Sequence, residues 1–216
     1  MVFTRNLLEI LNGKDAVLFD TNIYCGRPMN MSYIDRTRSP EFYLSLIGFY
    51  EKIEELHNQF GNIYFPKLIA REFLDNGRYP YKRLIKSTVI QNGKIERDNL
   101  KNREKANQKA RKFLRSLEEE GKILDFDSEK DTTYQYLKSL MGDLPLKHEI
   151  SLTDLDFLLS GAALASDGLD VTLLSNDFGI VRAWNTLICR TGIPPERLEF
   201  YIMLNNKSFK QMKVKK

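Results

Sequence analysis

Residues 16–22, AVLFDTN, combine a short apolar run with a polar turn. The run Ala16–Phe19 is short and apolar at every position, which is typical of a strand buried inside a sheet. A second run of this kind, VTLL, opens the stretch VTLLSND at 171–177. We therefore predict two buried strands, each followed closely by an acidic residue, Asp20 in one case and Asp177 in the other.

Strand-like and helix-like segments alternate along the rest of the chain. We predict further strands at 62–65, 123–126 and 198–203, and helices at 42–60, 67–74, 132–140, 151–165 and from 178 through Trp184. Pro66 suits the first position of a helix. This alternation predicts an α/β three-layer sandwich with a central, mainly parallel sheet, in which sites form beyond the carboxyl ends of the strands. Asp20 and Asp177 would both lie at that edge.

Composition narrows the class of protein further. The 216 residues are 42% hydrophobic and 29% charged, which suits one globular domain. No segment has the apolar run of a signal peptide or a membrane span, so we expect a soluble, cytoplasmic protein without a membrane partner. The cysteines (Cys25, Cys189) and histidines (His57, His148) are too few for a zinc site, and we expect both histidines to be ordinary surface or helix residues.

Five acidic residues are placed so that they could meet at one edge of the sheet. Asp20 and Asp177 follow strands, Glu72 lies on a predicted helix, and Asp154 and Asp156 lie in the first turn of another. Carboxylates at about 4 Å repel by about 4 kcal/mol per pair at an effective dielectric near 20. A divalent cation would relieve that repulsion, and oxygen ligands favour Mg²⁺ or Mn²⁺. Such an ion can activate water for phosphodiester hydrolysis.

Each acid also has a simpler interpretation. Asp20 and Asp177 could be turn or cap residues, and Glu72 could be a solvated helix residue. Asp154 and Asp156 could stabilise a helix N-terminus, in the S-x-x-D and T-x-x-D patterns that begin at Ser151 and Thr153.

In four stretches the chain resembles the PIN-domain nucleases, and the stretches occur in the order found in that family: FDTNIY (19–24), FPKLIAREF (65–73), SLTDLDFLLSGAAL (151–164) and VTLLSNDFGI (171–180). The resemblance implies a parallel sheet of order 3-2-1-4-5 and Mg²⁺- or Mn²⁺-dependent hydrolysis of RNA by an endoribonuclease. It implies a metal site of Asp20, Glu72, Asp177 and one of Asp154 and Asp156, with Thr21, Asn22 and Ser175 as supporting residues.

The choice between Asp154 and Asp156 stays open at this point. The distance to Ala163 favours Asp156, as in the small toxin-like members of the family. The local Thr-Asp pair favours Asp154, as in the ribosome-processing members. We prefer Asp154 because Thr153 is a good N-cap residue that would set the first turn.

The chain is longer than the toxin-like members and contains a basic helical insertion at about 78–148. Residues 78–122 carry 14 Lys/Arg and 6 Asp/Glu, a local charge of +8, whereas the whole chain carries +4. Tyr79 and Tyr81 could stack on bases. Lysines recur every three or four residues, and this stripe could follow a phosphate backbone or simply form a solvated helix face. We name as candidate RNA contacts Arg83, Lys101, Lys105, Lys109 and Lys112.

The leading hypothesis is therefore a metal-dependent ribonuclease, with RNA as its partner. The alternative is a non-catalytic RNA-binding or scaffold protein with the same fold. A phosphatase with an aspartate nucleophile fits poorly, since such enzymes usually need a second aspartate where this chain has Asn22. The sequence also leaves open whether the chain forms a homodimer and whether it binds a protein inhibitor or a ribonucleoprotein partner.

Overall fold

A computed structural model describes residues 4–20, 23, 40–76, 93–204 and 208–214. In that part of the chain, seven strands form one mixed sheet, in the order β1-β7-β6-β5-β2-β3-β4. The strands are β1 (Thr4–Arg5), β2 (Ala16–Phe19), β3 (Ile63–Pro66), β4 (Ile123–Leu124), β5 (Val171–Ser175), β6 (Leu198–Met203) and β7 (Phe209–Gln211).

Five neighbouring strands, β4, β3, β2, β5 and β6, are parallel to one another. In chain order among these five, the arrangement is 3-2-1-4-5, which confirms the predicted order. β7 pairs antiparallel with β6, and β1 pairs antiparallel with β7. The sequence interpretation did not predict β1 or β7. The observed sheet is therefore mixed, with its parallel part at the centre and at the β4 edge.

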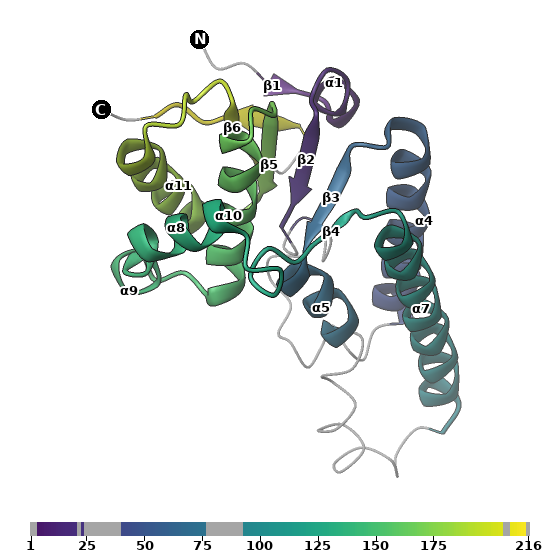
Figure 1. The fold of residues 1–216 in the computed structure, drawn as a ribbon. Coiled ribbons are helices and arrows are strands. Elements are labelled where there is room, and N and C mark those ends of the chain that lie inside the picture. Colours follow the sequence, from purple (N-terminus) through teal and green to yellow (C-terminus); the bar gives the residue numbers. More distant parts are fainter. Residues whose placement is uncertain (1–3, 21–22, 24–39, 77–92, 205–207, 215–216) are drawn as a thin grey trace.

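Helices lie on both sides of this sheet (Figure 1). Connections between parallel strands are right-handed, so helices in crossovers that step in opposite directions along the sheet cover opposite faces. In Figure 1, α4 and α7 lie to the right of β2 and β3, and α8 to α11 lie to the left. The helices are α1 (Leu7–Leu11), α4 (Pro40–Phe60), α5 (Lys67–Asn76), α7 (Gly93–Glu119), α8 (Thr132–Met141), α9 (Leu144–His148), α10 (Leu152–Ser166) and α11 (Phe178–Thr191).

The predicted elements all have counterparts, with shifted ends. Pro66 ends β3 instead of beginning a helix, and α5 starts at Lys67. The prediction for Pro66 was wrong, because this proline pairs with Leu124 of β4 at the end of the strand. Ser151, not Thr153, is the N-cap of α10: its hydroxyl accepts from the Asp154 amide, and the Asp154 carboxylate accepts from the Ser151 amide.

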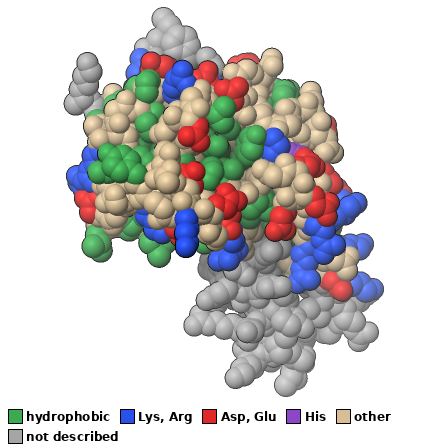
Figure 2. Space-filling model, in the orientation of Figure 1, with side chains coloured by type: hydrophobic (Ala, Val, Ile, Leu, Met, Phe, Trp, Pro, Cys, Tyr) green, Lys and Arg blue, Asp and Glu red, His purple; other side chains and the backbone are tan. Residues whose placement is uncertain are grey.

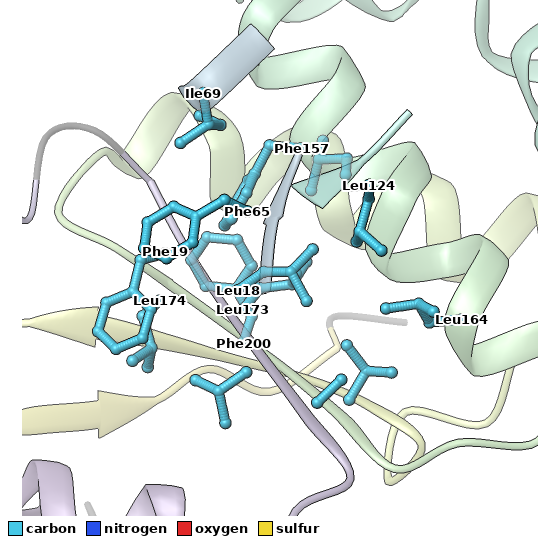
Figure 3. Close-up of a cluster of buried hydrophobic side chains, with 14 of the residues drawn as sticks. Leu18, Phe19, Phe65, Ile69, Leu124, Phe157, Leu164, Leu173, Leu174 and Phe200 are labelled. Atoms are coloured by element: carbon cyan, nitrogen blue, oxygen red, sulfur yellow. The ribbon is translucent and has the colours of Figure 1, made fainter. Parts of the chain in front are cut away.

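Aromatic packing beneath the sheet holds the end of β2 in place. Phe19 stacks on Phe65 of β3 with 6.4 Å between ring centroids, and Phe65 meets Phe113 of α7 edge-on at 5.9 Å. Figure 3 shows Phe19 and Phe65 side by side in the core. Phe19 is the residue before Asp20, so this packing fixes the backbone from which the Asp20 side chain extends.

On the other face, α10 packs closely on the sheet because it has a glycine at the contact. A Cβ atom at Gly161 would lie 2.7 Å from Leu173 Cδ2 and 3.3 Å from Leu198 Cδ1. Most of α10 is buried, including Phe157, Leu158 and Ala162. The position of its first turn, which carries Asp154, is therefore set by the core. Among the described residues, no helix is both long and apolar enough to cross a membrane.

Candidate active site

Asp20 lies at the carboxyl end of β2 and is 1% exposed. Its amide donates to the Leu174 carbonyl at 2.9 Å, which continues the pairing of β2 with β5. Its Oδ2 accepts a hydrogen bond of 2.6 Å from the hydroxyl of Ser175, which is also fully buried. The two strand ends are thus joined by side chains as well as by backbone.

Ser175 connects Asp20 to Asp177. The Ser175 Oγ accepts from the Asp177 amide at 2.9 Å while it donates to Asp20. Asp177 is exposed and serves as the N-cap of α11, since its Oδ1 accepts from the Gly179 amide at 2.6 Å. One hydroxyl therefore orients both the Asp20 carboxylate and the turn that carries Asp177.

Asp154 lies at the start of α10, where its Oδ2 accepts from the amide and the hydroxyl of Ser151, both at 2.8 Å. Burial raises the pKa of Asp154, and the hydrogen bonds from Ser151 oppose that shift. The negative charges of Asp177 and Glu72 raise its pKa further. Asp154 is therefore within the electrostatic reach of one acid on α5 and of the acid that caps α11.

Glu72 is half-buried in the second turn of α5, directly after β3. Its charge acts on Asp154, as described above. With the Asp20–Ser175–Asp177 hydrogen bonds, these interactions link acidic residues from four elements, namely Asp20, Glu72, Asp154 and Asp177. These are the four residues that we predicted as metal ligands from the sequence.

Asp156 has different surroundings, although it is only two residues from Asp154. It is 8% exposed, and its Oδ1 accepts a hydrogen bond of 2.6 Å from the Tyr134 hydroxyl of α8. Its Oδ2 accepts from the Leu68 amide in the first turn of α5 at 3.3 Å. Burial raises its pKa, and the acids that raise it further are Asp127 and Asp125 in the segment after β4. Asp156 thus joins α10 to α5 and α8.

Tyr134 is the residue of this region that the sequence interpretation missed. Burial and the neighbouring Asp156 carboxylate raise the pKa of its hydroxyl, which therefore stays protonated and donates. A signal was present, because Tyr134 shares the buried side of α8 with Leu137 and Met141. A tyrosine on an apolar helix face needs a buried partner for its hydroxyl.

The donor set suits Mg²⁺ or Mn²⁺ in its chemistry, since the acids supply hard oxygen ligands. The acidic side chains are not arranged as ligands around one point in this structure. Within the described part of the chain, no three His, Cys, Asp or Glu side chains are grouped closely enough to hold a metal ion. Two of the carboxylates are turned toward helix amides, Asp154 toward Ser151 and Asp177 toward Gly179. Binding of an ion would require these carboxylates to reorient.

Two predicted supporting residues, Thr21 and Asn22, and the predicted RNA contact Arg83 lie outside the described residues, as do Tyr79 and Tyr81. The predicted lysines lie on α7, which packs along α4. Lys101, Lys105 and Lys112 are exposed, whereas Lys109 is half-buried and forms a 2.6 Å ion pair with Glu51 of α4. The stripe is therefore solvated at three of its four positions.

Comparisons with known proteins add no relative to this picture. No family model, no curated protein and no solved structure matches the chain. The assignment of function therefore depends on the arrangement of the residues described above.

Proposed function

We propose that the chain is a PIN-like, divalent-metal-dependent ribonuclease that hydrolyses RNA phosphodiester bonds at the carboxyl edge of the parallel strands. The supporting observation is that the Ser175 hydroxyl joins the Asp20 carboxylate to the Asp177 backbone amide, and that the charges of Asp177 and Glu72 add to the effect of burial in raising the pKa of Asp154. Placing several like charges together costs stability, so proteins tend to do so where function requires it.

In this proposal Asp20, Glu72, Asp154 and Asp177 hold Mg²⁺ or Mn²⁺. When bound, the ion supplies Lewis acidity toward water and toward the phosphodiester. Ser175 keeps the Asp20 carboxylate pointed in one direction, because its hydroxyl donates to Oδ2 and is itself fixed by the Asp177 amide. Asp156 is a positioning residue that holds the first turn of α5, four residues before Glu72.

The experiment that tests this proposal is RNA cleavage by an Asp20→Asn variant in the presence of Mn²⁺. Asparagine can still accept from Ser175, so the fold should persist, and circular dichroism checks this. We expect the cleavage rate to fall at least about a hundredfold, because loss even of residues that only support metal ligands costs 10–100-fold. Asp127→Asn serves as the control, since Asp127 pairs with Lys138 and is not one of the four proposed ligands. Cleavage by Asp20→Asn at the wild-type rate would refute the proposal.

A non-catalytic RNA-binding or scaffold protein is the second candidate. The observation that favours it is that Asp154 and Asp177 already have structural roles as caps of α10 and α11. Such a protein would bind RNA and leave it intact at every Mn²⁺ concentration. A titration of Mn²⁺ against labelled RNA therefore separates the two candidates.

A further inference from the structure

An aromatic side chain is exposed directly beside the acidic residues. Phe178, the residue after Asp177, is 62% exposed at the start of α11. The rest of the apolar face of this helix, including Ile180, Ala183 and Trp184, is buried in the core. More than half of the Phe178 side chain is thus exposed to solvent, where a ligand can reach the ring.

Arg182 is also exposed, four residues after Phe178. Residues four apart lie on the same face of a helix, with about 5–6 Å between their Cβ atoms. The structure records neither a hydrogen bond nor an ion pair between the Arg182 guanidinium and any residue that it describes. An aromatic ring and an available cation therefore lie on one face of α11.

The neighbouring end of α9 adds positive charge and apolar surface. A Cβ atom at Gly179 would lie 3.9 Å from the His148 carbonyl oxygen, so the first turn of α11 adjoins α9. Burial lowers the pKa of His148, and the charges of Lys147, Arg182 and Arg190 lower it further. Arg190 is paired with Asp143, whereas Lys147 and Arg182 have no ion pair with any residue that the structure describes and can act on a ligand.

Exposed leucines occur on the same side of the molecule. Leu146 of α9 is 90% exposed, and Leu152, two residues before Asp154, is 71% exposed. Figure 2 shows acidic side chains near the middle of one face, with hydrophobic and basic side chains to their left, where Figure 1 has α8, α9 and α11. Apolar and basic side chains thus border acidic side chains on this face of the molecule (Figure 2).

We propose that Phe178 and Arg182 form a nucleotide-binding subsite for single-stranded RNA next to the carboxylates, in which a base stacks on Phe178 and a phosphate pairs with Arg182. Single-stranded nucleic acid is recognised by this combination of aromatic rings and cations. The inference rests on the proposed ribonuclease function, since it takes RNA to be the ligand. The unpaired cations favour a polyanion over an apolar protein surface as the occupant.

The test is a binding measurement in the non-cleaving Asp20→Asn background, with two fluorescent probes. One probe is a short single-stranded RNA, and the other is an abasic ribose-phosphate oligomer of the same length. Phe178→Ala should weaken binding of the RNA about fivefold or more and leave the abasic oligomer unaffected, because only a base can stack. Phe178→Trp should retain affinity for the RNA, whereas Phe178→Leu should not.

Arg182→Ala should weaken binding of both probes and reduce the salt dependence of their affinities, because a phosphate contact is lost. Leu8→Ala is the matched control, since Leu8 is an exposed apolar residue of α1, which lies near the amino end of β2, whereas Asp20 follows its carboxyl end (Figure 1). Thermal unfolding of each variant checks that the fold is intact.

Equal RNA affinity for Phe178→Ala and its parent would overturn the subsite, as would equal losses on the two probes. A change in self-association without a change in RNA affinity would also overturn it and indicate a protein-binding surface. The ribonuclease proposal is judged separately, by cleavage in Mn²⁺. If the wild-type protein cleaves RNA and Phe178→Ala does not change RNA affinity, the subsite alone is refuted. If the binding results are as expected but the wild-type protein does not cleave RNA, the ribonuclease function alone is refuted.

Discussion

Asp154 and Asp156 lie two residues apart on α10, yet their carboxylates have different partners. Asp154 is influenced by the charges of Glu72 and Asp177, whereas Asp156 is held by Tyr134 and Leu68. Two residues along a helix correspond to a rotation of about 200°. The two side chains therefore leave the helix in nearly opposite directions, and Asp154 is the one whose pKa responds to the charges of the predicted ligands Asp177 and Glu72.

At the residue scale, the raised pKa of Asp154 predicts how stability depends on pH. A carboxyl group whose pKa is higher in the folded state contributes stability below its unfolded value, 3.8, and this contribution is lost as the pH rises through the folded value. We expect Asp154→Asn to remove that loss, because asparagine does not titrate.

Urea unfolding at several pH values from about 4 to about 8, the range in which a carboxyl group with a raised pKa titrates, measures this effect. The free energy of unfolding of Asp154→Asn, relative to wild type, should increase as the pH rises. A difference that stays constant across this range would contradict the raised pKa. Asp127→Asn gives the opposite control, because the hydrogen bond from Lys138 lowers the pKa of Asp127.

Tyr134→Phe tests the positioning role of Asp156. Removing the hydroxyl takes away a buried hydrogen bond to a carboxylate, and we expect a loss of about 1.5–3 kcal/mol in the free energy of unfolding. The first turn of α5 should become less well fixed, so the rate of RNA cleavage should fall while affinity for Mn²⁺ changes little. A variant as stable and as active as wild type would contradict this role.

At the scale of elements, α7 carries much of the basic stretch 78–122 and packs along α4. The buried side of α7 includes Ala106, Ala110, Phe113 and Leu117. His57 of α4 is buried, and its Nε2 lies 2.8 Å from Glu120 Oε2, just after α7. His57 is thus a helix residue, as predicted, but its position is in the core. The charge of α7 is left on its solvent side, where a phosphate backbone could bind.

The lysines of α7 should differ in their contribution to RNA binding. Substituting Lys101, Lys105 and Lys112 together by alanine should weaken binding and reduce the slope of log affinity against log salt by about 0.7 per lost phosphate contact. Lys109→Ala should change the slope less, because Lys109 is already paired with Glu51. Fluorescence anisotropy at several salt concentrations measures both, and equal slopes for the triple variant and wild type would exclude this helix from the RNA-binding surface.

At the scale of the whole molecule, the sequence predicted the central elements and the strand order correctly. Every residue of Ala16–Phe19 and Val171–Ser175 is buried because both faces of the central sheet are covered, and most of these residues are apolar, so their pattern is strong. β1 and β7 were missed because strands of two or three residues carry almost no periodic signal. Asp156 could not be separated from Asp154, since that distinction depends on Tyr134 and on the position of α5, which are tertiary contacts.

The central claim is that acidic residues from four elements share one divalent cation, and the most direct test is thermal unfolding at increasing Mn²⁺ concentration. Ligand that binds only the folded state adds about 2.7 kcal/mol at a hundredfold excess over its Kd. The Tm of the wild-type protein and of the Asp127→Asn control should therefore rise with Mn²⁺, and the Tm of Asp20→Asn and Asp177→Asn should change little. A wild-type Tm that does not respond to Mn²⁺, or an equal rise in all four proteins, would contradict the claim.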